Sequence, residues 1–532
     1  METTIPLPLI GAEDMTPLVR QLIELVRQQS EQIEQLTAEN QALRDEVARL
    51  KKHARRPQVK PSRPSRPQSP SDPTPGKRPG SAKRHKTETL EIHETRRIAP
   101  ASRPDNATFL GCRSYTVQDI RITSHNIRYE LEQWEGPDGT VYGGQLPPSA
   151  QGGHFGPTLR SFILYQYYHG HVTQPRLLVQ LREYGVDISS GQLSRLLTEG
   201  HEAFHAEKTD MLSTALAVSP YVQTDDTGAR HQGKNGYCTY IGTPWMSWFA
   251  STDSKSRLNF LTLLRAGQTL YVLEPDAITY MEERGLPKTW LALIREFTGY
   301  AFLDDAAWQT FLTSLGMEVP EPIRIATEGA MLGALLCQGV TPDLVVLSDG
   351  AGQFNVFLHA LCWIHAERSL TKLIPVTEQE QAALDAAREE FWRCYADLQA
   401  YQQAPDEAQR ILLTWRFERL TARKTDYASL DAVLQRLGSH QAQLLRVLEY
   451  PEVPVHNNGS EQAIREYVTR RKISGGTRSE AGRNSRDTFT SLKQTCRKVG
   501  ISFWQYLMDR LGRHDTILPL ADLIRQRTLE PG

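Results

Sequence analysis

Cysteine is scarce in this chain, and long hydrophobic runs are missing. The six cysteines among 532 residues lie far apart without a Cys-x-x-Cys pair, so neither a disulfide framework nor a four-cysteine zinc site is expected. No apolar run reaches the roughly 18 residues that a membrane-spanning helix needs. The sequence opens without a charged-then-apolar leader. We therefore expect a protein of the reducing cytoplasm that is neither exported nor inserted in a membrane.

Net charge is also small, at −1, but the charged residues are strongly segregated along the chain. Residues 51–86 contain twelve Lys or Arg and a single acid, Asp72, interleaved with Pro and Ser. Such a composition cannot bury a core, so it predicts a disordered, extended arm. The excess of one sign favours contact with DNA phosphates over the alternative of a solvated linker.

A heptad pattern precedes this arm. Its a and d positions are, in chain order, Val19, Leu22, Val26, Gln29, Ile33, Leu36, Asn40, Leu43, Val47 and Leu50. β-Branched residues at a with Leu at d favour a parallel dimer, and one Asn at an a position fixes the register. We expect an oligomerisation coiled coil. The alternative, an amphipathic helix packed on its own domain, is disfavoured by the Pro-rich tract that follows at once.

The stretch from 88 to 153 alternates polar and apolar residues and then reaches Gly-rich turns, as in GPDGTVYGG. This pattern is typical of a small β-rich unit. Its role cannot be read from the sequence.

Three short helical stretches follow in residues 154–215, and each ends on Gly. The second and third are joined by Val186 to Ile188, with Ser189 or Ser190 as a natural N-cap, which is the spacing of a helix-turn-helix. Three packing helices of an ordinary α domain fit the same pattern. If the motif is a helix-turn-helix, the residues that face a DNA groove are Gln192, Ser194 and Arg195.

Three acidic residues stand where strands or helices are expected to begin or end. We place Asp225 and Asp226 at the end of the first strand of an antiparallel hairpin whose turn is expected at GKNG. Asp349 follows the apolar run LVVL, which suits a buried strand. Glu461 opens a helix directly after a Gly-Ser turn.

Each acid also has an ordinary structural explanation. Asp349 with Gly350 forms a common strand-ending turn. Glu461 fits a capping-box-like pair with Asn458 and an i,i+4 ion pair with Arg465. Together, however, the three acids form the set that a two-metal phosphoryl-transfer site needs, because Mg²⁺ prefers carboxylate oxygens and water and shared acids must bridge the two ions.

Four segments resemble the blocks of one known family. In order, TDDTGAR, LSDGAGQFN, LCWIHAER and NNGSEQAIREYVTRRK are similar to blocks of the transposases of insertion-sequence family 66. The resemblance holds by block and not over the whole chain. It implies an α/β ribonuclease-H-like catalytic core with a helical insertion, preceded by an N-terminal coiled coil, a disordered basic arm, a small β-rich unit and a helical helix-turn-helix-like domain.

The resemblance also implies the reaction and its residues. Asp225, Asp349 and Glu461 would form an Asp-Asp-Glu triad that binds two Mg²⁺ ions and catalyses strand cleavage and strand transfer of an insertion sequence. Cys362 and His365 would fill the Cys-x-x-His motif that follows the second acid. Residues 377–449 are rich in helix-formers, which agrees with an insertion before the Glu.

The sequence departs from the family pattern in two places. Where family members carry a Cys-rich, zinc-ribbon-like segment, this chain offers only Cys112. Cys362 and His365 alone are weak evidence of a metal, so we expect no zinc. The stretch from about 257 to 322 also looks longer than the family pattern, and it has no assigned task.

Residues 465–514 contain twelve Lys or Arg against four acids. Because Glu461 starts the same segment, we expect a DNA-backbone surface beside the active site, and a solvated helical face is the alternative. The candidate DNA contacts here are Arg465, Arg471, Lys472 and Arg478. The expected partners are the transposon ends and target DNA at the nucleoid, a second copy bound through the coiled coil, and accessory proteins of the same element.

Two other functions fit parts of the sequence. Asp226-Thr227-Gly228 is the tripeptide that aspartic proteases place at their catalytic dyad, but such enzymes need a second motif or a homodimer, and the residues that follow it are polar. A DNA-binding regulator derived from a transposase would keep the architecture without catalysis. The joint presence of three acids and the Cys-x-x-His pair argues against that alternative.

The length of the chain predicts several structural units. The expected boundaries are 1–50 for the coiled coil, 51–87 for the arm, 88–153 for the β-rich unit, 154–215 for the DNA-binding helices, 216–375 for the first part of the core, 376–450 for the helical insertion, and 451–532 for the last part of the core with basic helices.

Overall fold

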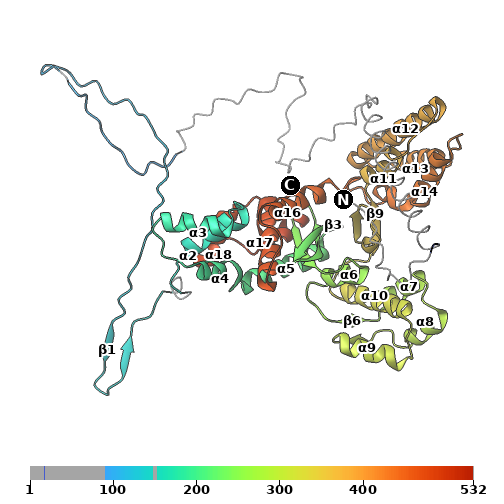
Figure 1. The fold of residues 1–532 in the computed structure, drawn as a ribbon, viewed down its shortest axis with the longest axis horizontal. Coiled ribbons are helices and arrows are strands. Elements are labelled where there is room, and N and C mark those ends of the chain that lie inside the picture. The colour runs from blue at the N-terminus through green and yellow to red at the C-terminus, as the bar shows by residue number, and fades with distance from the viewer. Residues whose placement is uncertain (1–16, 18–89, 103, 148–152, 531–532) are drawn as a thin grey trace. The chain divides into compact units, whose positions relative to one another are not determined.

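The computed structural model describes residue 17 and residues 90–102, 104–147 and 153–530 (Figure 1). The chain divides into two units, 1–63 and 64–532, and the elements below belong to the second. The coiled coil predicted for 1–50, apart from residue 17, and the basic arm predicted for 51–87 lie outside the described residues. None of the described helices is both long and apolar enough to cross a membrane.

A mixed five-stranded sheet carries the candidate site, with the strand order β5-β4-β3-β8-β9. Its strands are β3 (Tyr221–His231), β4 (Lys234–Gly242), β5 (Ser247–Thr252), β8 (Val345–Ser348) and β9 (Leu358–Leu361). The first three form an antiparallel meander, whereas β8 and β9 run parallel to β3. With helices on its faces, the sheet forms an α/β core, as the sequence predicts.

The β3–β4 hairpin turns earlier than the sequence predicts. Its turn residues are Gln232 and Gly233, whose φ angles are 50° and 80°. A two-residue loop with both residues left-handed matches the twist of the flanking strands. Most of GKNG therefore belongs to β4, and β3 runs on to His231. Asp225 and Asp226 consequently lie within β3 and not at its end, which corrects their predicted placement.

The two faces of the sheet pack against different helices. Val222 of β3 joins the main hydrophobic core together with residues of α5 (Glu202–Val218) and α10 (Pro320–Cys337). On the other face, Tyr240 of β4 lies in a cluster with Tyr467 of α16 (Asn458–Ser474). Asp225 pairs with Tyr240 across the ladder. Because side chains alternate along a strand, Asp225 shares the α16 face and Asp226 points to the opposite one.

Helix α17 (Glu480–Val499) covers the outer edge of the sheet. Alternate N–H groups of β5 donate to side-chain oxygens four residues apart in α17: Ser247 to Thr495 (3.1 Å), Phe249 to Ser491 (2.9 Å) and Ser251 to Asp487 (2.6 Å). The repeats match because two strand residues rise by about 6.8 Å and four helical residues by about 6 Å. The helix thus occupies donors that would otherwise be open to another strand.

Residues 257–322, which the sequence leaves without a task, fold against α10. Their elements are α6 (Arg257–Leu264), β6 (Tyr271–Val272), α7 (Pro275–Glu283), α8 (Lys288–Arg295), β7 (Ala301–Phe302) and α9 (Asp305–Ser314). β6 and β7 pair antiparallel. A Cβ atom at Gly333 of α10 would lie only 2.2 Å from the carbonyl oxygen of Val272, so α10 approaches β6 closely because it lacks a side chain there.

Residues 363–448 are almost wholly helical, as their helix-forming composition predicts. After β9 the elements are α11 (Trp363–Thr371), α12 (Glu378–Gln403), α13 (Glu407–Thr421), α14 (Ala428–Ser439), α15 (Gln441–Leu444) and the 3-10 turn η5 (Arg446–Leu448). Another 3-10 turn, η4 (Gly352–Phe354), precedes β9. These helices share a hydrophobic cluster of their own. At its centre, buried Trp363 donates to the carbonyl oxygen of Leu444 at 2.7 Å.

The helices before the sheet and the C-terminal ones share the main hydrophobic core with β3, α5 and α10. They are α2 (Pro157–Leu164), the π-helix η3 (Tyr165–His169), α3 (Gln174–Glu183) and α4 (Ser190–Thr198), together with α18 (Phe503–Gly512) and α19 (Leu520–Leu529). Ser189 caps α4 in a capping box with Gln192, which confirms the predicted N-cap. The link between α3 and α4 is longer than predicted, because α3 ends at Glu183.

Residues 90–102 and 104–147 contain little regular structure. A hairpin of β1 (Gln133–Glu135) and β2 (Val141–Gly143) forms, and the remaining described residues of this stretch have neither helix nor strand. Tyr115 and Ile120 are 90% and 78% exposed. The expectation of a β-rich unit therefore holds only for this hairpin. An alternating pattern predicts strands only where a third strand or a helix covers the apolar side.

Candidate active site

Two of the three predicted acids lie at the same level of neighbouring parallel strands. The pairing of β3 with β8 ends at Gln223 and Leu347. Asp225 stands two residues beyond this last pair on β3, and Asp349 stands two residues beyond it on the other chain segment, directly after β8. The two strands therefore bring both carboxylates to the edge where the parallel pairing ends.

The third acid, Glu461, lies in the first turn of α16. This helix packs on the face of β3 that carries Asp225, at the same end of the sheet. Its start is close to the strand, since a Cβ atom at Gly459 would lie 2.5 Å from the side-chain oxygen of Gln223. The Gly-Ser pair that the sequence places before the helix belongs to its first turn.

The pKa of Asp225 is affected by its burial and by the charges of the other acids. Burial raises the pKa of Asp225 to about 7, and the negative charges of Asp349, Asp226 and Glu461 act in the same direction. The backbone N–H of Asp226 donates to the Asp225 carboxylate at 2.8 Å and lowers the pKa. Asp225 in β3, Asp349 after β8 and Glu461 in the first turn of α16 are called the acidic cluster below, because the charges of the other two act on Asp225.

Glu461 is held by α11 and not by its own helix. Its carboxylate oxygen lies 3.6 Å from Nε2 of His365 and 3.3 Å from Nη2 of Arg368. The two local roles that the sequence offered for Glu461, a capping-box-like pair with Asn458 and an ion pair with Arg465, are not formed in the described structure. The helix begins one residue earlier than that pair requires, with Asn457 as its N-cap.

The Cys-x-x-His motif divides its two side chains between different partners. Cys362 is buried at the start of α11, and its Sγ accepts a hydrogen bond from the backbone N–H of Asn457 at 3.2 Å. His365 faces Glu461 instead. Sequence reasoning missed Asn457. Its signal is the Asn-Asn pair at which the helix of the third acid begins, of which only Asn458 drew notice.

Asp226 has surroundings of its own. Its carboxylate accepts a hydrogen bond from the side-chain amide of Gln353 at 2.7 Å. Burial raises the pKa of Asp226, the charge of Lys255 lowers it, and the charge of Asp349 raises it as it does for Asp225. Asp225 and Asp226 are therefore distinct sites although they are adjacent in sequence.

The chemistry of the acidic cluster fits a hard divalent cation. Three carboxylates offer the oxygen ligands that Mg²⁺ prefers, and burial together with the neighbouring negative charges disfavours charge on Asp225 unless a cation is near. Within the described ranges, however, no three His, Cys, Asp or Glu side chains converge closely enough to hold a metal ion as they stand. Glu461 would have to exchange its contacts with His365 and Arg368 for the ion.

Comparison with known proteins identifies the family of the chain. Residues 152–277 and 344–485, half of the chain, match the family described as "Transposase IS66 family". The chain belongs to this family. An uncharacterized protein, y4jO of Sinorhizobium fredii (strain NBRC 101917 / NGR234), is 41% identical to it over 317 residues, which are 59% of this chain and 99% of that protein. A transposase of the IS66 family is a DNA-processing enzyme, so DNA is its substrate class.

The family match covers the candidate site residues of this IS66 transposase but not one segment between them. The matched ranges include all three acids, Cys362 and His365. They leave out residues 278–343, where α8, α9 and α10 lie. The extra segment noticed in the sequence is therefore largely the part outside the match. Membership in the family sets the aspartic protease alternative aside.

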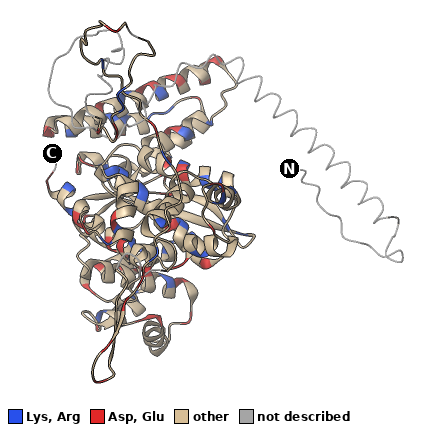
Figure 2. Ribbon diagram, turned by 90° about the vertical axis from the view of Figure 1, so that its left-hand side faces the viewer, with Lys and Arg blue, Asp and Glu red and all other residues tan. Residues whose placement is uncertain are grey.

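The residues predicted to contact DNA differ in exposure and in whether their side chains already bind other groups of the protein. Arg195, Arg465, Lys472 and Arg478 are exposed, and Ser194 is half-buried. Gln192 is engaged in the cap of α4, and Arg471 donates to the carbonyl oxygen of Gly228. Figure 2 shows basic and acidic residues interspersed along the helices.

Part of the C-terminal basic segment is used for packing. Arg470, Arg486 and Lys493 are buried. The Arg470 guanidinium lies 3.9 Å from the ring centre of Tyr167, and Lys493 donates to the carbonyl oxygen of Tyr168 at 2.6 Å. These cations join α16 and α17 to the π-helix η3. The count of basic residues therefore overstates the surface that DNA could contact.

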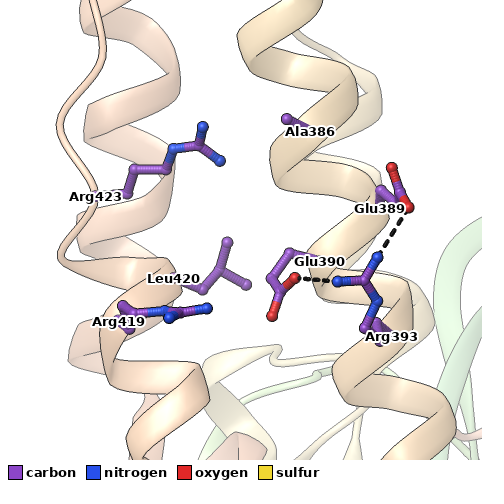
Figure 3. Close-up of a pocket in the computed structure, with 7 residues that line it drawn as sticks. All are labelled: Ala386, Glu389, Glu390, Arg393, Arg419, Leu420 and Arg423. Carbon is purple, nitrogen blue, oxygen red and sulfur yellow. Dashed lines mark hydrogen bonds and ion pairs between the residues drawn. The ribbon is translucent and has the colours of Figure 1, made fainter.

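A cleft of about 550 Å³ lies between α12 and α13 (Figure 3). It is lined by Ala386, Glu389, Glu390, Arg393, Arg419, Leu420 and Arg423. Arg393 forms ion pairs with Glu389 and Glu390, both at 2.9 Å, so much of the charge on this lining is compensated internally. None of the acids of the candidate site lines this cleft.

Proposed function

We propose that this transposase cleaves DNA at the ends of its element and joins the cut ends to target DNA, using Mg²⁺ bound by Asp225, Asp349 and Glu461 on a ribonuclease-H-like core. The observation that supports the proposal is the position of Asp225 and Asp349, each two residues beyond the last parallel pair of β3 and β8, with Glu461 in the first turn of the helix that packs on the Asp225 face. Support also comes from the parallel arrangement of β3 and β8, which brings two of the acids to one sheet edge.

Two of the three acids are fixed by backbone structure, whereas the third is held by side-chain contacts. Asp225 is fixed by the ladder of β3 with β4, and Asp349 by the turn after β8, in which its carboxylate accepts from the N–H of Ala351 at 3.0 Å. Glu461 sits on a helix and contacts two side chains of α11, so it is the acid that can move between them and the cation. When bound, Mg²⁺ would activate the attacking oxygen and stabilise the leaving one.

DNA binding is assigned to surfaces outside this cluster. We place end recognition at α3 and α4, where Arg195 and Ser194 remain accessible on the second helix of a helix-turn-helix-like pair. Arg465, Lys472 and Arg478 are exposed on or just after the helix that carries Glu461. They would hold the phosphate backbone next to the acids.

The test is cleavage of a duplex that carries the inverted repeats flanking the gene. With Mg²⁺ we expect strand cleavage that leaves a 3′-hydroxyl, and none when the metal is removed by a chelator. Binding of the repeats without cleavage, at any Mg²⁺ concentration, would contradict the proposal and favour the regulator that has lost catalysis. A matched duplex with scrambled repeats is the control.

A further inference from the structure

Asn457 makes an unusual set of contacts for a residue outside the acidic triad. It is 1% exposed. Its side-chain amide donates to the carbonyl oxygen of Thr224 at 2.8 Å, and its side-chain oxygen accepts from the hydroxyl of Ser460 at 2.7 Å. Its backbone N–H donates to Sγ of Cys362 at 3.2 Å. Both polar ends of the side chain and the backbone N–H are therefore satisfied inside the protein.

These contacts reach the elements that carry the acidic cluster. Thr224 directly precedes Asp225 in β3, and Asn457 directly precedes α16, the helix of Glu461. Cys362 is the N-cap of α11, whose His365 faces Glu461. One buried residue thus connects the strand of the first acid, the helix of the third acid, and the helix that contacts the third acid.

The amide of Asn457 is suited to a gap in the sheet. Pairing of β3 with β8 ends at Gln223, so β8 offers no partner to the carbonyl group of Thr224. The Asn457 amide supplies that partner. A buried carbonyl left without a donor costs about 1–3 kcal/mol. A carboxylate of the same shape could not donate, because ionised Asp is only an acceptor.

We propose that Asn457 is a positioning residue, which holds the start of α16 against β3 so that Glu461 stays beside Asp225 and Asp349. This inference rests on the proposed function of the acids. It assigns to Asn457 no contact with DNA or metal. Its effect passes through the backbone of β3 and the first turn of α16.

The test compares Asn457→Asp and Asn457→Ala in the full chain with Asn458→Ala. Asn458 is the adjacent residue of the same type, and its half-buried side chain forms no hydrogen bond or ion pair with the described residues. Because displacement of a catalytic group by about 1 Å can cost about 100-fold in rate, we expect each Asn457 variant to lose about that much cleavage and to need more Mg²⁺ for half-maximal rate. Binding of the repeats should be unchanged, and Asn458→Ala should behave as wild type.

Hydrogen exchange at the first turn of α16 gives a readout that does not depend on cleavage. We expect faster exchange there in both Asn457 variants and not in Asn458→Ala. Unchanged exchange together with wild-type cleavage would overturn the inference. If the wild type cleaves nothing with Mg²⁺ but the Asn457 variants exchange faster, the proposed function fails while the positioning contact stands.

A folding defect is separated from a positioning defect by a milder variant. Ser460→Ala removes the hydroxyl that orients the Asn457 side chain but keeps the bond of the Asn457 amide to Thr224, so the expected loss of stability is about 1–3 kcal/mol and the variant should still fold. We expect a smaller loss of cleavage in the same direction. Wild-type cleavage and wild-type exchange in Ser460→Ala would contradict the role given to Asn457, even if Asn457→Ala does not fold.

Discussion

The carboxylate of Asp226 accepts a 2.7 Å hydrogen bond from the side-chain amide of Gln353, whereas its neighbour Asp225 accepts from the backbone N–H of Asp226 and is affected by the charge of Glu461. The charge of Asp349 raises the pKa of both. Alternation along β3 separates the two side chains, so adjacent acids have different surroundings. Gln353 follows β8 in the short turn η4, and the hydrogen bond ties that turn to β3. Asp226 therefore has a structural task of its own.

This separation makes Asp226 the control for Asp225. Asp226→Asn keeps the shape and can still accept a hydrogen bond through its amide oxygen, so we expect cleavage close to wild type. Asp225→Asn removes the charge that would hold the cation, and cleavage should be lost. The measurement is strand cleavage with Mg²⁺ on the flanking repeats. The opposite result, loss with Asp226→Asn alone, would show that the first carboxylate is misassigned.

The contact of α17 with the sheet edge predicts a loss of stability. Ser491→Ala removes the hydroxyl that accepts from the N–H of Phe249, and a buried donor left without a partner costs about 1–3 kcal/mol. Chemical denaturation should show that decrease in the free energy of unfolding. Ser213→Ala is the matched control, because its exposed hydroxyl only donates within its own helix and should change little. Equal stability of the two variants would show that the hydrogen bond from Phe249 to Ser491 does not stabilise the protein.

Much of the core can be predicted from the sequence because its signals are local. The run LVVL places Asp349 directly after a strand, and the Ser at 189 predicts the start of α4. The composition of 377–449 predicts helices. The end of β3 could not be predicted, because the turn at Gln232 and Gly233 depends on two left-handed residues and not on the more conspicuous GKNG.

Contacts between distant segments could not be read from the sequence at all. The sequence allows an ion pair of Glu461 with Arg465, four residues away, but in the fold Glu461 contacts His365 and Arg368 instead. Basic residues such as Lys493 could be counted but not divided into buried and exposed ones. The resemblance to a family identified which acids to examine, and only the fold shows that two of them lie at the same level of neighbouring parallel strands.

The first 50 residues are predicted to assemble the transposase through a parallel coiled coil. A seam of apolar a and d positions would otherwise expose its apolar stripe to water. Removal of residues 1–50 should therefore reduce the oligomeric mass measured by light scattering. An unchanged mass would contradict the prediction. Substitution of Leu36 and Leu43 by Lys in the full chain is expected to have the same effect as the truncation.

The arm at 51–86 is predicted to add affinity for DNA of any sequence. Its Lys and Arg residues would displace counterions from phosphates, so binding should weaken steeply as salt rises. Deletion of the arm should flatten the slope of log K against log salt concentration. A replacement of equal length rich in Gly and Ser controls for the loss of a linker. Equal slopes for all three proteins would show that the arm only connects its neighbours.

The central claim is that Asp225, Asp349 and Glu461 act as one unit. The most direct measurement is the cleavage rate of Asp225→Asn, Asp349→Asn, Glu461→Gln and the triple variant, with binding of the repeats measured in parallel. Residues that act together are not additive, so each single variant should lose nearly all cleavage, the triple variant should be little worse, and binding should persist. Cleavage that survives in any of the three single variants would remove that acid from the triad, and cleavage that survives in the triple variant would contradict the account.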